Sequence, residues 1–384
     1  MDTPVYLDYN ATTPIDPRVR EAMAPYLEEH FGNPSTSYGY GKRTKEAVDY
    51  AREQVATLIG AEPEEVVFTS GGSESDNQAL IGTALANMHK GRHIITSRIE
   101  HPAVINTCHY LEQRLGFTVT YLPVDQYGLV NPDDVRHAIA AETTLVTIMH
   151  ANNEVGTIEP IAEIGGIAQE RGVLFHTDAA QSCGKIRVDV GQLKVDLLTL
   201  AGHKLYAPKG IGVLFIRNGT NIDSYIHGAG QEKGRRAGTE NVPYIVGLGK
   251  ACELAAQNLD SYASSVKPLR DRLYDKIAAG LGKERVSRNG HPEKRLPNTL
   301  NISIRGIVGE ELLGGIPGIA ASTGAACHAG STEPSSVLLE MGLSRELALG
   351  ALRLTLGRWS TQDEIDTAAK LIVDGAKRLL GGTK

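Results

Sequence analysis

The side chains best suited to covalent chemistry in this chain follow two short apolar segments. Lys204 stands in L-A-G-H-K-L-Y-A-P-K, and Asp178 stands in F-H-T-D-A-A-Q, each after a run of apolar residues. A lysine amine can condense with an aldehyde to form a Schiff base, and a nearby carboxylate can keep a pyridine nitrogen protonated. The pair therefore suits pyridoxal 5′-phosphate (PLP). Because most lysines are solvated surface charges, this interpretation needs support from the rest of the chain.

The segment S-G-G-S-E-S-D-N, residues 70–77, has the pattern of an anion site. It follows an expected strand and opens an expected helix, so its free backbone N–H groups and the helix dipole favour an anion. Gly71 and Gly72 permit close approach, and Ser73 supplies a hydroxyl group. The segment lacks both G-x-G-x-x-G and the lysine of a P-loop, which argues against a nucleotide and for one small phosphate. An ordinary helix cap is the alternative.

Other polar side chains also follow expected strands or lie in polar loops. His101 in E-H-P suits stacking on a ring or shuttling protons, and Asn152 in H-A-N-N-E suits holding a ring substituent. Thr239, in the basic loop R-R-A-G-T-E-N, suits a phosphate contact, and Arg353 offers a planar fork for a substrate carboxylate. Each has a structural alternative: a hydrogen-bonded histidine, a turn residue or a solvated charge.

The four cysteines are far apart in the sequence and form no C-x-x-C motif. This usage indicates a reducing, cytoplasmic compartment, in which a special cysteine is catalytic rather than structural. Cys327 lies beside His328 in the small-residue segment T-G-A-A-C-H-A-G-S, a setting that can lower a thiol pKa and make a nucleophile. We interpret Cys108, Cys183 and Cys252 as inert thiols.

Composition excludes several classes of function. The 384 residues have an ordinary balance of 41% hydrophobic and 22% charged residues and a net charge of −6, so we expect no general affinity for nucleic acid or an anionic membrane. No apolar run approaches the roughly 20 residues that span a bilayer. The N-terminus lacks the basic and apolar regions of a secretory signal. We expect no metal site.

The apolar runs predict an α/β fold with a mainly parallel, seven-stranded sheet covered by helices on both faces, because they do not alternate and helical segments separate them. Functional residues of such sheets gather at the carboxyl ends of the strands. We expect a large domain over residues 16–255. A smaller α+β domain, from residues 1–15 and 256–384, would carry the Cys327 loop. The expected strands of the large sheet are residues 66–69, 93–97, 119–123, 145–150, 174–177, 197–201 and 212–216.

Taken together, the chain resembles the cysteine desulfurase and selenocysteine lyase family, PLP enzymes of fold type I in the class-V aminotransferase group. The resemblance runs from Y-L-D-Y-N-A-T-T at residues 6–13 to L-R-L-T-L-G-R at residues 352–358, nearly the whole chain. Between them stand F-G-N-P-S, F-T-S-G-G-S-E-S-D-N, E-H-P-A-V, H-A-N-N-E-V-G, H-T-D-A-A-Q-S, G-H-K-L-Y-A-P-K-G and R-A-G-T-E-N-V, in family order. The ordered set is far more specific than any one motif.

The resemblance implies a role for each site residue. Lys204 would bind the cofactor aldehyde and move the Cα proton, Asp178 would pair with the ring nitrogen, and His101 would stack on the ring. Gln181 would contact the ring hydroxyl, and Cys327 would receive sulfur or assist the release of selenium. The remaining residues implied are Gly72, Ser73 and His203 at the phosphate, Thr239 at the phosphate from the second subunit of a homodimer, and Asn33, Asn152 and Arg353 at the amino-acid substrate.

Two departures from the commonest desulfurases bear on the substrate. Ala201 stands where many have a serine before the His-Lys pair, and the loop reads T-G-A-A-C-H rather than S-G-S-A-C. Both features are similar to selenocysteine lyases, so we expect removal of selenium from L-selenocysteine, leaving L-alanine. The alternative is a cysteine desulfurase that forms a Cys327 persulfide and delivers sulfur to an acceptor protein. Another PLP reaction, such as transamination, and a non-catalytic PLP-binding scaffold are further alternatives.

Overall fold

A seven-stranded sheet organises the larger part of the computed structural model, which describes residues 3–324 and 333–381. Its strand order is β2-β8-β7-β6-β5-β3-β4, and β8 runs antiparallel to both of its neighbours while the other strands are parallel. The strands are β2 Val66–Thr69, β3 His93–Ser97, β4 Thr118–Leu122, β5 Thr143–Thr147, β6 Leu174–Asp178, β7 Leu197–Ala201 and β8 Gly212–Ile216. The predicted α/β class with a mainly parallel sheet is confirmed.

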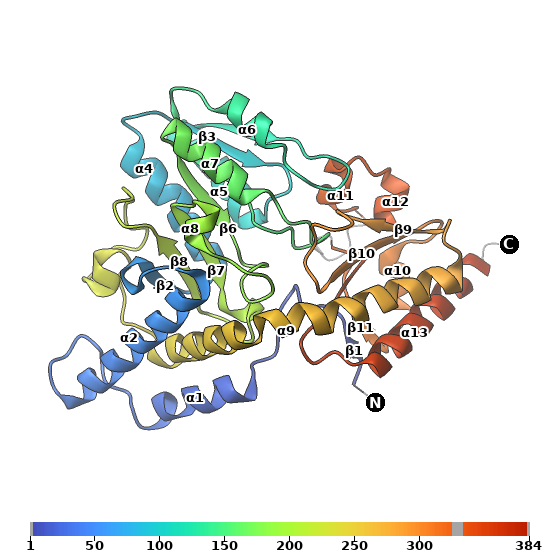
Figure 1. The fold of residues 1–384 in the computed structure, drawn as a ribbon, viewed down its shortest axis with the longest axis horizontal. Coiled ribbons are helices and arrows are strands. Elements are labelled where there is room, and N and C mark those ends of the chain that lie inside the picture. Colours follow the sequence, from blue (N-terminus) through green and yellow to red (C-terminus); the bar gives the residue numbers. More distant parts are fainter. Residues whose placement is uncertain (1–2, 325–332, 382–384) are drawn as a thin grey trace.

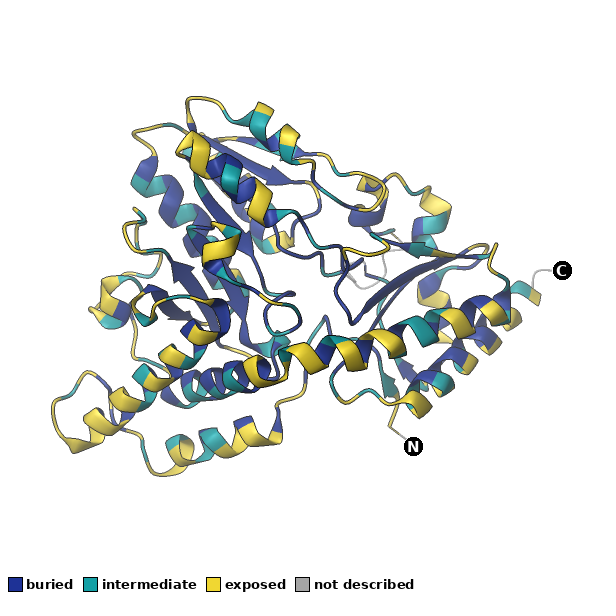
Figure 2. Cartoon of the chain, viewed as in Figure 1, coloured by how far each residue is buried: buried dark blue, intermediate teal, exposed yellow. Residues whose placement is uncertain are grey.

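Helices cover both faces of this sheet (Figure 1). Successive strand residues point to opposite faces, so Val146 of β5 belongs to one hydrophobic cluster and Leu145 to another. The strands are almost wholly buried (Figure 2), which explains their unbroken apolar runs. One cluster includes residues of α1 Pro17–Glu28, α2 Gly39–Ile59, α6 Pro132–Ala138, α7 Ile161–Arg171, α8 Val190–Leu193 and the start of α9 Val242–Leu281. The other includes residues of η2 Gln78–Gly82, α4 Thr83–Asn87 and α5 Pro102–Leu115, and the short helix α3 Gly72–Asn77 precedes η2 and contacts β7 and β8.

A separate hydrophobic cluster forms around the antiparallel sheet β12-β10-β9. The N-terminal lead lies here, because β1 pairs in parallel with β11 and Leu7 is buried in this cluster. The elements of this region are β1 Val5–Tyr6, β9 Val286–Asn289, β10 Thr299–Ile304, α10 Gly309–Gly314, β11 Ile319–Ala320, α11 Ser336–Glu340, α12 Arg345–Leu349, β12 Ala351–Thr355 and α13 Gln362–Gly381. Helices α9 and α13 pack side by side along one side of it (Figure 1).

Helix α9 connects the two regions. Its buried hydrophobic side chains up to Ala255 belong to the cluster of the large sheet, and those from Tyr262 onward belong to the cluster of the small sheet. The division that we predict at residue 255 therefore falls inside a continuous helix, and it stays a prediction. Among the helices of the described residues, none has the length and apolarity that a membrane crossing requires.

Candidate active site

The carboxyl ends of five strands of the large sheet, β5 with the following Met149 and Ala151 among them, border one cavity of about 290 Å³. β2 leads into α3, β3 leads through a short loop to α5, β6 ends at Asp178, and β7 is followed by the turn η3, Gly202–Lys204. These ends lie along one edge of the sheet, where α/β proteins place their ligands. The cavity brings together these predicted site residues: Gly72, Ser73, His101, Asp178, Gln181, His203, Lys204 and Arg353.

Lys204 enters this cavity from the turn after β7. Its Nζ donates hydrogen bonds to the backbone carbonyls of Asn10, at 2.5 Å, and Ala11, at 2.7 Å. Burial, helped by the charge of Arg353, lowers the pKa of Lys204 to about 8, although the nearby carboxylates Asp178 and Asp8 oppose this shift. A substantial fraction of the amine is therefore neutral near pH 7.5, as attack on an aldehyde requires.

Asp178 is buried at the end of β6, with 7% of its surface exposed. Its Oδ1 accepts a hydrogen bond from the backbone N–H of Ala180 at 2.9 Å. Burial raises the pKa of Asp178, and the Ala180 N–H and the charges of His101 and Lys204 offset part of this effect. No ion pair to Asp178 is formed within residues 3–324 and 333–381. A buried carboxylate in this state suits a cationic ring nitrogen.

His101 caps the N-terminus of α5 and faces the same cavity. Its Nδ1 accepts a hydrogen bond from the backbone N–H of Ala103 at 3.1 Å, so a neutral ring carries its proton on Nε2. Burial lowers the pKa of His101, although the charge of Asp178 acts in the opposite direction. A neutral imidazole ring is the form that suits stacking against an aromatic ring.

Gly72, Ser73 and His203 provide an anion cradle in this cavity. Gly72 begins α3, so its N–H and that of Ser73 belong to the first turn of the helix and have no intrahelical acceptor. Gly71, at φ +152°, has open space where a Cβ would stand. Burial lowers the pKa of His203 to about 4, so the ring is neutral and its Nδ1 lies 3.2 Å from the Thr12 hydroxyl.

These groups fit PLP. The cradle matches a phosphate, the buried Asp178 matches a ring nitrogen that must stay protonated, and the neutral amine of Lys204 matches an aldehyde. Gln181 lines the cavity with its amide Nε2 directed to the Asn10 carbonyl, and its contact with the ring hydroxyl stays a prediction.

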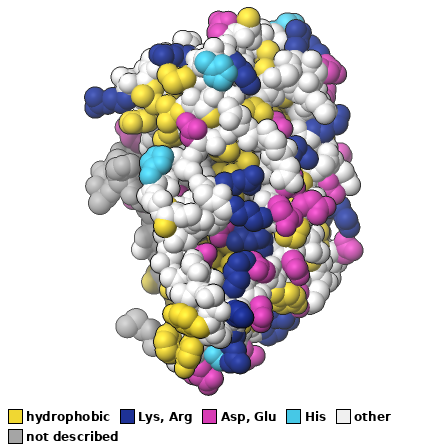
Figure 3. Space-filling model, turned by 90° about the vertical axis from the view of Figure 1, so that its left-hand side faces the viewer, with side chains coloured by type: hydrophobic (Ala, Val, Ile, Leu, Met, Phe, Trp, Pro, Cys, Tyr) yellow, Lys and Arg dark blue, Asp and Glu magenta, His cyan; other side chains and the backbone are white. Residues whose placement is uncertain are grey.

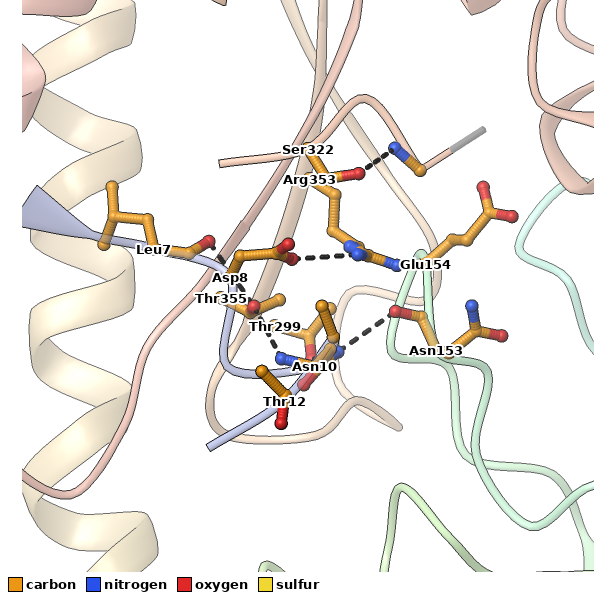
Figure 4. A network of polar contacts seen from close by, with 12 residues as sticks. Leu7, Asp8, Asn10, Thr12, Asn153, Glu154, Thr299, Ser322, Arg353 and Thr355 are labelled. Atoms are coloured by element: carbon orange, nitrogen blue, oxygen red, sulfur yellow. Dashed lines mark hydrogen bonds and ion pairs between the residues drawn. The ribbon is translucent and has the colours of Figure 1, made fainter. Parts of the chain in front are cut away.

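Arg353 stands where the PLP cavity meets a second, wider cavity of about 910 Å³. It lies in β12, and its Nη2 donates to Asp8 Oδ1 at 2.8 Å (Figure 4). Its buried Nε has no hydrogen-bond partner among the described residues. Gly324 and Glu333, the residues on either side of 325–332, both line the wider cavity. Arg353 is therefore placed to bind a carboxylate that enters by this route.

Some predicted site residues are not in the cavity. Asn152 is fully buried, and its Oδ1 accepts hydrogen bonds from the backbone N–H groups of Glu154 and Val155, while its neighbour Asn153 lines the cavity. Asn33 and Thr239 are exposed and do not line it. The roles of these three residues stay predictions. Cys327 and His328 lie outside the described residues.

Sequence reasoning missed two buried residues that touch the predicted site. Asn10 lines the PLP cavity and its carbonyl accepts the hydrogen bonds of Lys204 and Gln181. Lys185 does not line this cavity, but it donates hydrogen bonds to both Gln181 and Asn10. Their signals were weak: Asn10 stands in the Y-N-A-T-T motif, and Lys185 follows Gln181 by four residues.

A lysine and a buried acid at the ends of neighbouring parallel strands, with an anion cradle beside them, define a PLP enzyme of fold type I. The class-V aminotransferase family matches residues 5–367. The chain is 51% identical over 377 residues, 98% of this chain and 92% of the relative, to the cysteine desulfurase IscS of Methanosarcina thermophila. It is 49% identical over 374 residues, 97% of this chain and 94% of the relative, to a cysteine desulfurase IscS of Clostridium botulinum.

Solved structures agree with these relatives. A NifS-like protein superposes with a TM-score of 0.91 at 38% identity, over 98% of this chain and 100% of that one. SspA in complex with cysteine superposes with a TM-score of 0.82 at 40% identity, over 93% of this chain and 99% of that one. The chain belongs to the cysteine desulfurase family of class-V aminotransferases, whose members depend on PLP.

Proposed function

We propose that this enzyme removes sulfur from L-cysteine to leave L-alanine, with Cys327 as the sulfur acceptor. The observation that carries the proposal is that Lys204, Asp178 and Arg353 line one cavity. Arg353 also lines the wider cavity, as do Gly324 and Glu333, the described residues nearest in sequence to Cys327. Relatives that match nearly the whole chain bear the name cysteine desulfurase, and one similar structure contains cysteine. The sequence alone favours L-selenocysteine and leaves L-cysteine as the alternative substrate. These relatives favour L-cysteine.

Each residue of the site has a defined task. Arg353 binds the substrate carboxylate and so fixes the α-carbon. Bound PLP supplies an electron sink for the bonds around that carbon. Lys204, as a neutral amine, takes the Cα proton and later returns a proton to the substrate. Asp178 holds a proton on the ring nitrogen, and His101 covers the ring and excludes water from it.

The sulfur step uses the thiolate of Cys327 as a nucleophile. Cys327 attacks the sulfur of the substrate, so an S–S bond forms while the Cβ–S bond breaks and its electron pair stays with the carbon skeleton. Protonation of that skeleton gives alanine. Cysteine and the Cys327 thiol thus become alanine and a Cys327 persulfide, and an acceptor protein with a free thiol then takes the outer sulfur.

The position of Ala201 weakens the argument for selenocysteine that its residue type suggests. Its Cβ lies 3.3 Å from the position that a Cβ on Gly72 would occupy, so Ala201 borders the phosphate cradle. A missing hydroxyl there changes the hold on phosphate, not the contact with the sulfur or selenium atom. The remaining signal, T-G-A-A-C-H, surrounds Cys327, outside the described residues.

Alanine formation from cysteine and from selenocysteine tests the proposal. We expect wild-type enzyme to turn over cysteine, and Cys327→Ala to lose about 10²-fold or more of that activity because the nucleophile is gone. Selenolate is the better leaving group, so Cys327→Ala should keep more activity on selenocysteine. Cys252→Ala, which removes a buried thiol in α9, is the matched control and should turn over cysteine normally. Full cysteine turnover by Cys327→Ala would contradict the proposal.

We also propose that two copies of the chain form a homodimer, in which Thr239 and Asn33 reach the partner's site. Both residues are exposed and absent from the cavity of their own chain. The side carrying the α1–α2 connection shows a column of lysine and arginine side chains with hydrophobic groups beside it (Figure 3). Phe31, Tyr38 and Tyr40, near the start of α2, are each at least 60% exposed, as expected of an uncovered interface.

Mixing subunits tests this arrangement. We expect a mass in solution of twice the 41.2 kDa of one chain. Thr239→Ala should weaken PLP binding about tenfold, because one phosphate hydrogen bond is lost. Heterodimers of Thr239→Ala with Lys204→Ala subunits should then regain one intact site. No recovery on mixing, or a monomer in solution, would contradict the proposed role of Thr239 in the partner's site.

A further inference from the structure

Lys185 is a buried lysine to which the reaction assigns no task. It is 5% exposed and does not line the PLP cavity. Its Nζ donates to the side-chain carbonyl oxygens of Gln181, at 2.9 Å, and Asn10, at 3.0 Å. Burial lowers the pKa of Lys185 well below its usual range. Lys185 forms no ion pair with the residues that the structure describes, and a buried amine in this state costs folding free energy.

The partners of Gln181 fix the orientation of its amide group. The atom of Gln181 that faces Lys185 is Oε1, which accepts a hydrogen bond from Nζ at 2.9 Å. The Asn10 backbone carbonyl only accepts, so the atom 3.0 Å from it must be Nε2. The two contacts agree, and a flipped amide would place donor against donor and acceptor against acceptor.

Asn10 is held in the same way from the other side of the network. Its Oδ1 accepts from Lys185 and from Asn298 at 2.9 Å. Its Nδ2 donates to Thr299 Oγ1 at 2.9 Å and to the Asn153 carbonyl at 3.1 Å (Figure 4). Because both polar atoms of the Asn10 side chain are hydrogen-bonded, the residue is held in place. Its backbone carbonyl, which accepts the hydrogen bond of Gln181, therefore has a fixed position.

We propose that Lys185 is a positioning residue, which holds the Gln181 amide with its N–H side toward the PLP cavity. The inference rests on the proposed contact of Gln181 with the ring hydroxyl of PLP. With Lys185 in place, Gln181 can only donate to that oxygen. Without Lys185, Oε1 loses its donor, and only the contact of Nε2 with the Asn10 carbonyl still opposes a flip that would turn Oε1 toward the ring oxygen.

PLP affinity and the absorption spectrum of the bound cofactor test this inference without any cysteine. We expect Lys185→Met to weaken PLP binding about tenfold and to shift the absorption maximum, since the ring hydroxyl loses its donor. In a Gln181→Ala background, Lys185→Met should change the affinity less than about twofold. That outcome would show that Lys185 acts through Gln181.

Two further variants separate positioning from folding. Lys185→Gln keeps a donor at this site and should recover most of the affinity. Asn298→Ala removes the other donor to Asn10 Oδ1 without touching Gln181, so it should lower the melting temperature and change PLP affinity and the spectrum less than Lys185→Met does. Normal PLP binding by Lys185→Met, or an equal loss in the Gln181→Ala background, would overturn the inference. Neither result would bear on the transfer of sulfur to Cys327.

Discussion

Replacement of Lys204 by alanine should reduce alanine formation from cysteine by at least about 10⁴-fold. The variant loses both the amine that binds the PLP aldehyde and the base that moves the Cα proton. Its fold should survive, because the hydrogen bonds lost are two contacts to the backbone carbonyls of Asn10 and Ala11 at the edge of a cavity. Stopped-flow or end-point alanine assays, with the melting temperature as a check on folding, measure the effect.

Lys204→Arg is the matched variant, because it keeps hydrogen-bond donors at this position while it removes the reactive amine. Arginine can still donate to the two carbonyls, but its pKa above about 12 leaves no neutral form to attack an aldehyde. We expect the same loss of activity as for Lys204→Ala.

In the wild-type protein without PLP, the rate of PLP uptake should rise as the pH approaches about 8, the pKa of Lys204, and reach a plateau above it. An arginine variant with substantial activity would rule out this role of Lys204.

The sequence predicted the central sheet well because burial of both faces forces apolar runs. The segment around Phe175 and the one around Leu198 carry no polar side chain pointing to solvent, so each is recognisable without its partner strand. Asp178 and Lys204 follow these runs, and parallel neighbours such as β6 and β7 end at one edge. The proximity of Asp178 and Lys204 was therefore predictable from the order of the two strands along the sequence.

What the sequence could not supply is the set of contacts between distant segments. Asn10 receives hydrogen bonds from Lys185 and Asn298, and only the folded chain brings these three residues together. Lys185 alone looks like any other lysine in a sequence.

Asn152 shows the reverse problem. An asparagine whose Oδ1 binds its own loop at Glu154 and Val155 cannot be told by residue type from one that binds a cofactor. For Asn33 and Thr239, a single chain has no means of showing what a second copy contributes.

Replacement of Asp178 by asparagine should lower turnover by about 10²–10³-fold, the usual cost of removing one preorganised electrostatic contact. Asparagine has nearly the same shape and can still accept the Ala180 N–H through Oδ1. What it lacks is the negative charge that keeps the ring nitrogen protonated, so PLP becomes a weaker electron sink. The change should appear mainly in kcat, because the contacts of Arg353 with the substrate carboxylate remain.

The melting temperature of Asp178→Asn without PLP is a second, independent measurement. Burial raises the pKa of Asp178 above its value in the unfolded chain, so the folded protein binds this proton more readily and loses stability as the pH rises through that window. At neutral pH the carboxylate of Asp178 therefore lowers the stability of the wild-type protein without PLP. PLP-free Asp178→Asn should melt at the same temperature as PLP-free wild type or higher. A lower turnover together with an equal or higher melting temperature would locate the defect in the chemistry.

Asp196 provides the matched control for this experiment. It lies at the opposite end of the same strands, where its Oδ2 accepts the backbone N–H of Phe175 at 2.9 Å, and it borders no part of the PLP cavity. Asp196 is partly exposed and pairs with Arg217, whose Nε lies 4.0 Å from Oδ1, so Asp196→Asn makes the same chemical change near the surface and away from the cavity. Its kcat should stay within about twofold of wild type, because surface electrostatics of this kind contribute little. Equal losses in both variants, or an Asp178→Asn enzyme within tenfold of wild type, would contradict the assignment, since only a charge beside the ring nitrogen can act on the electron sink.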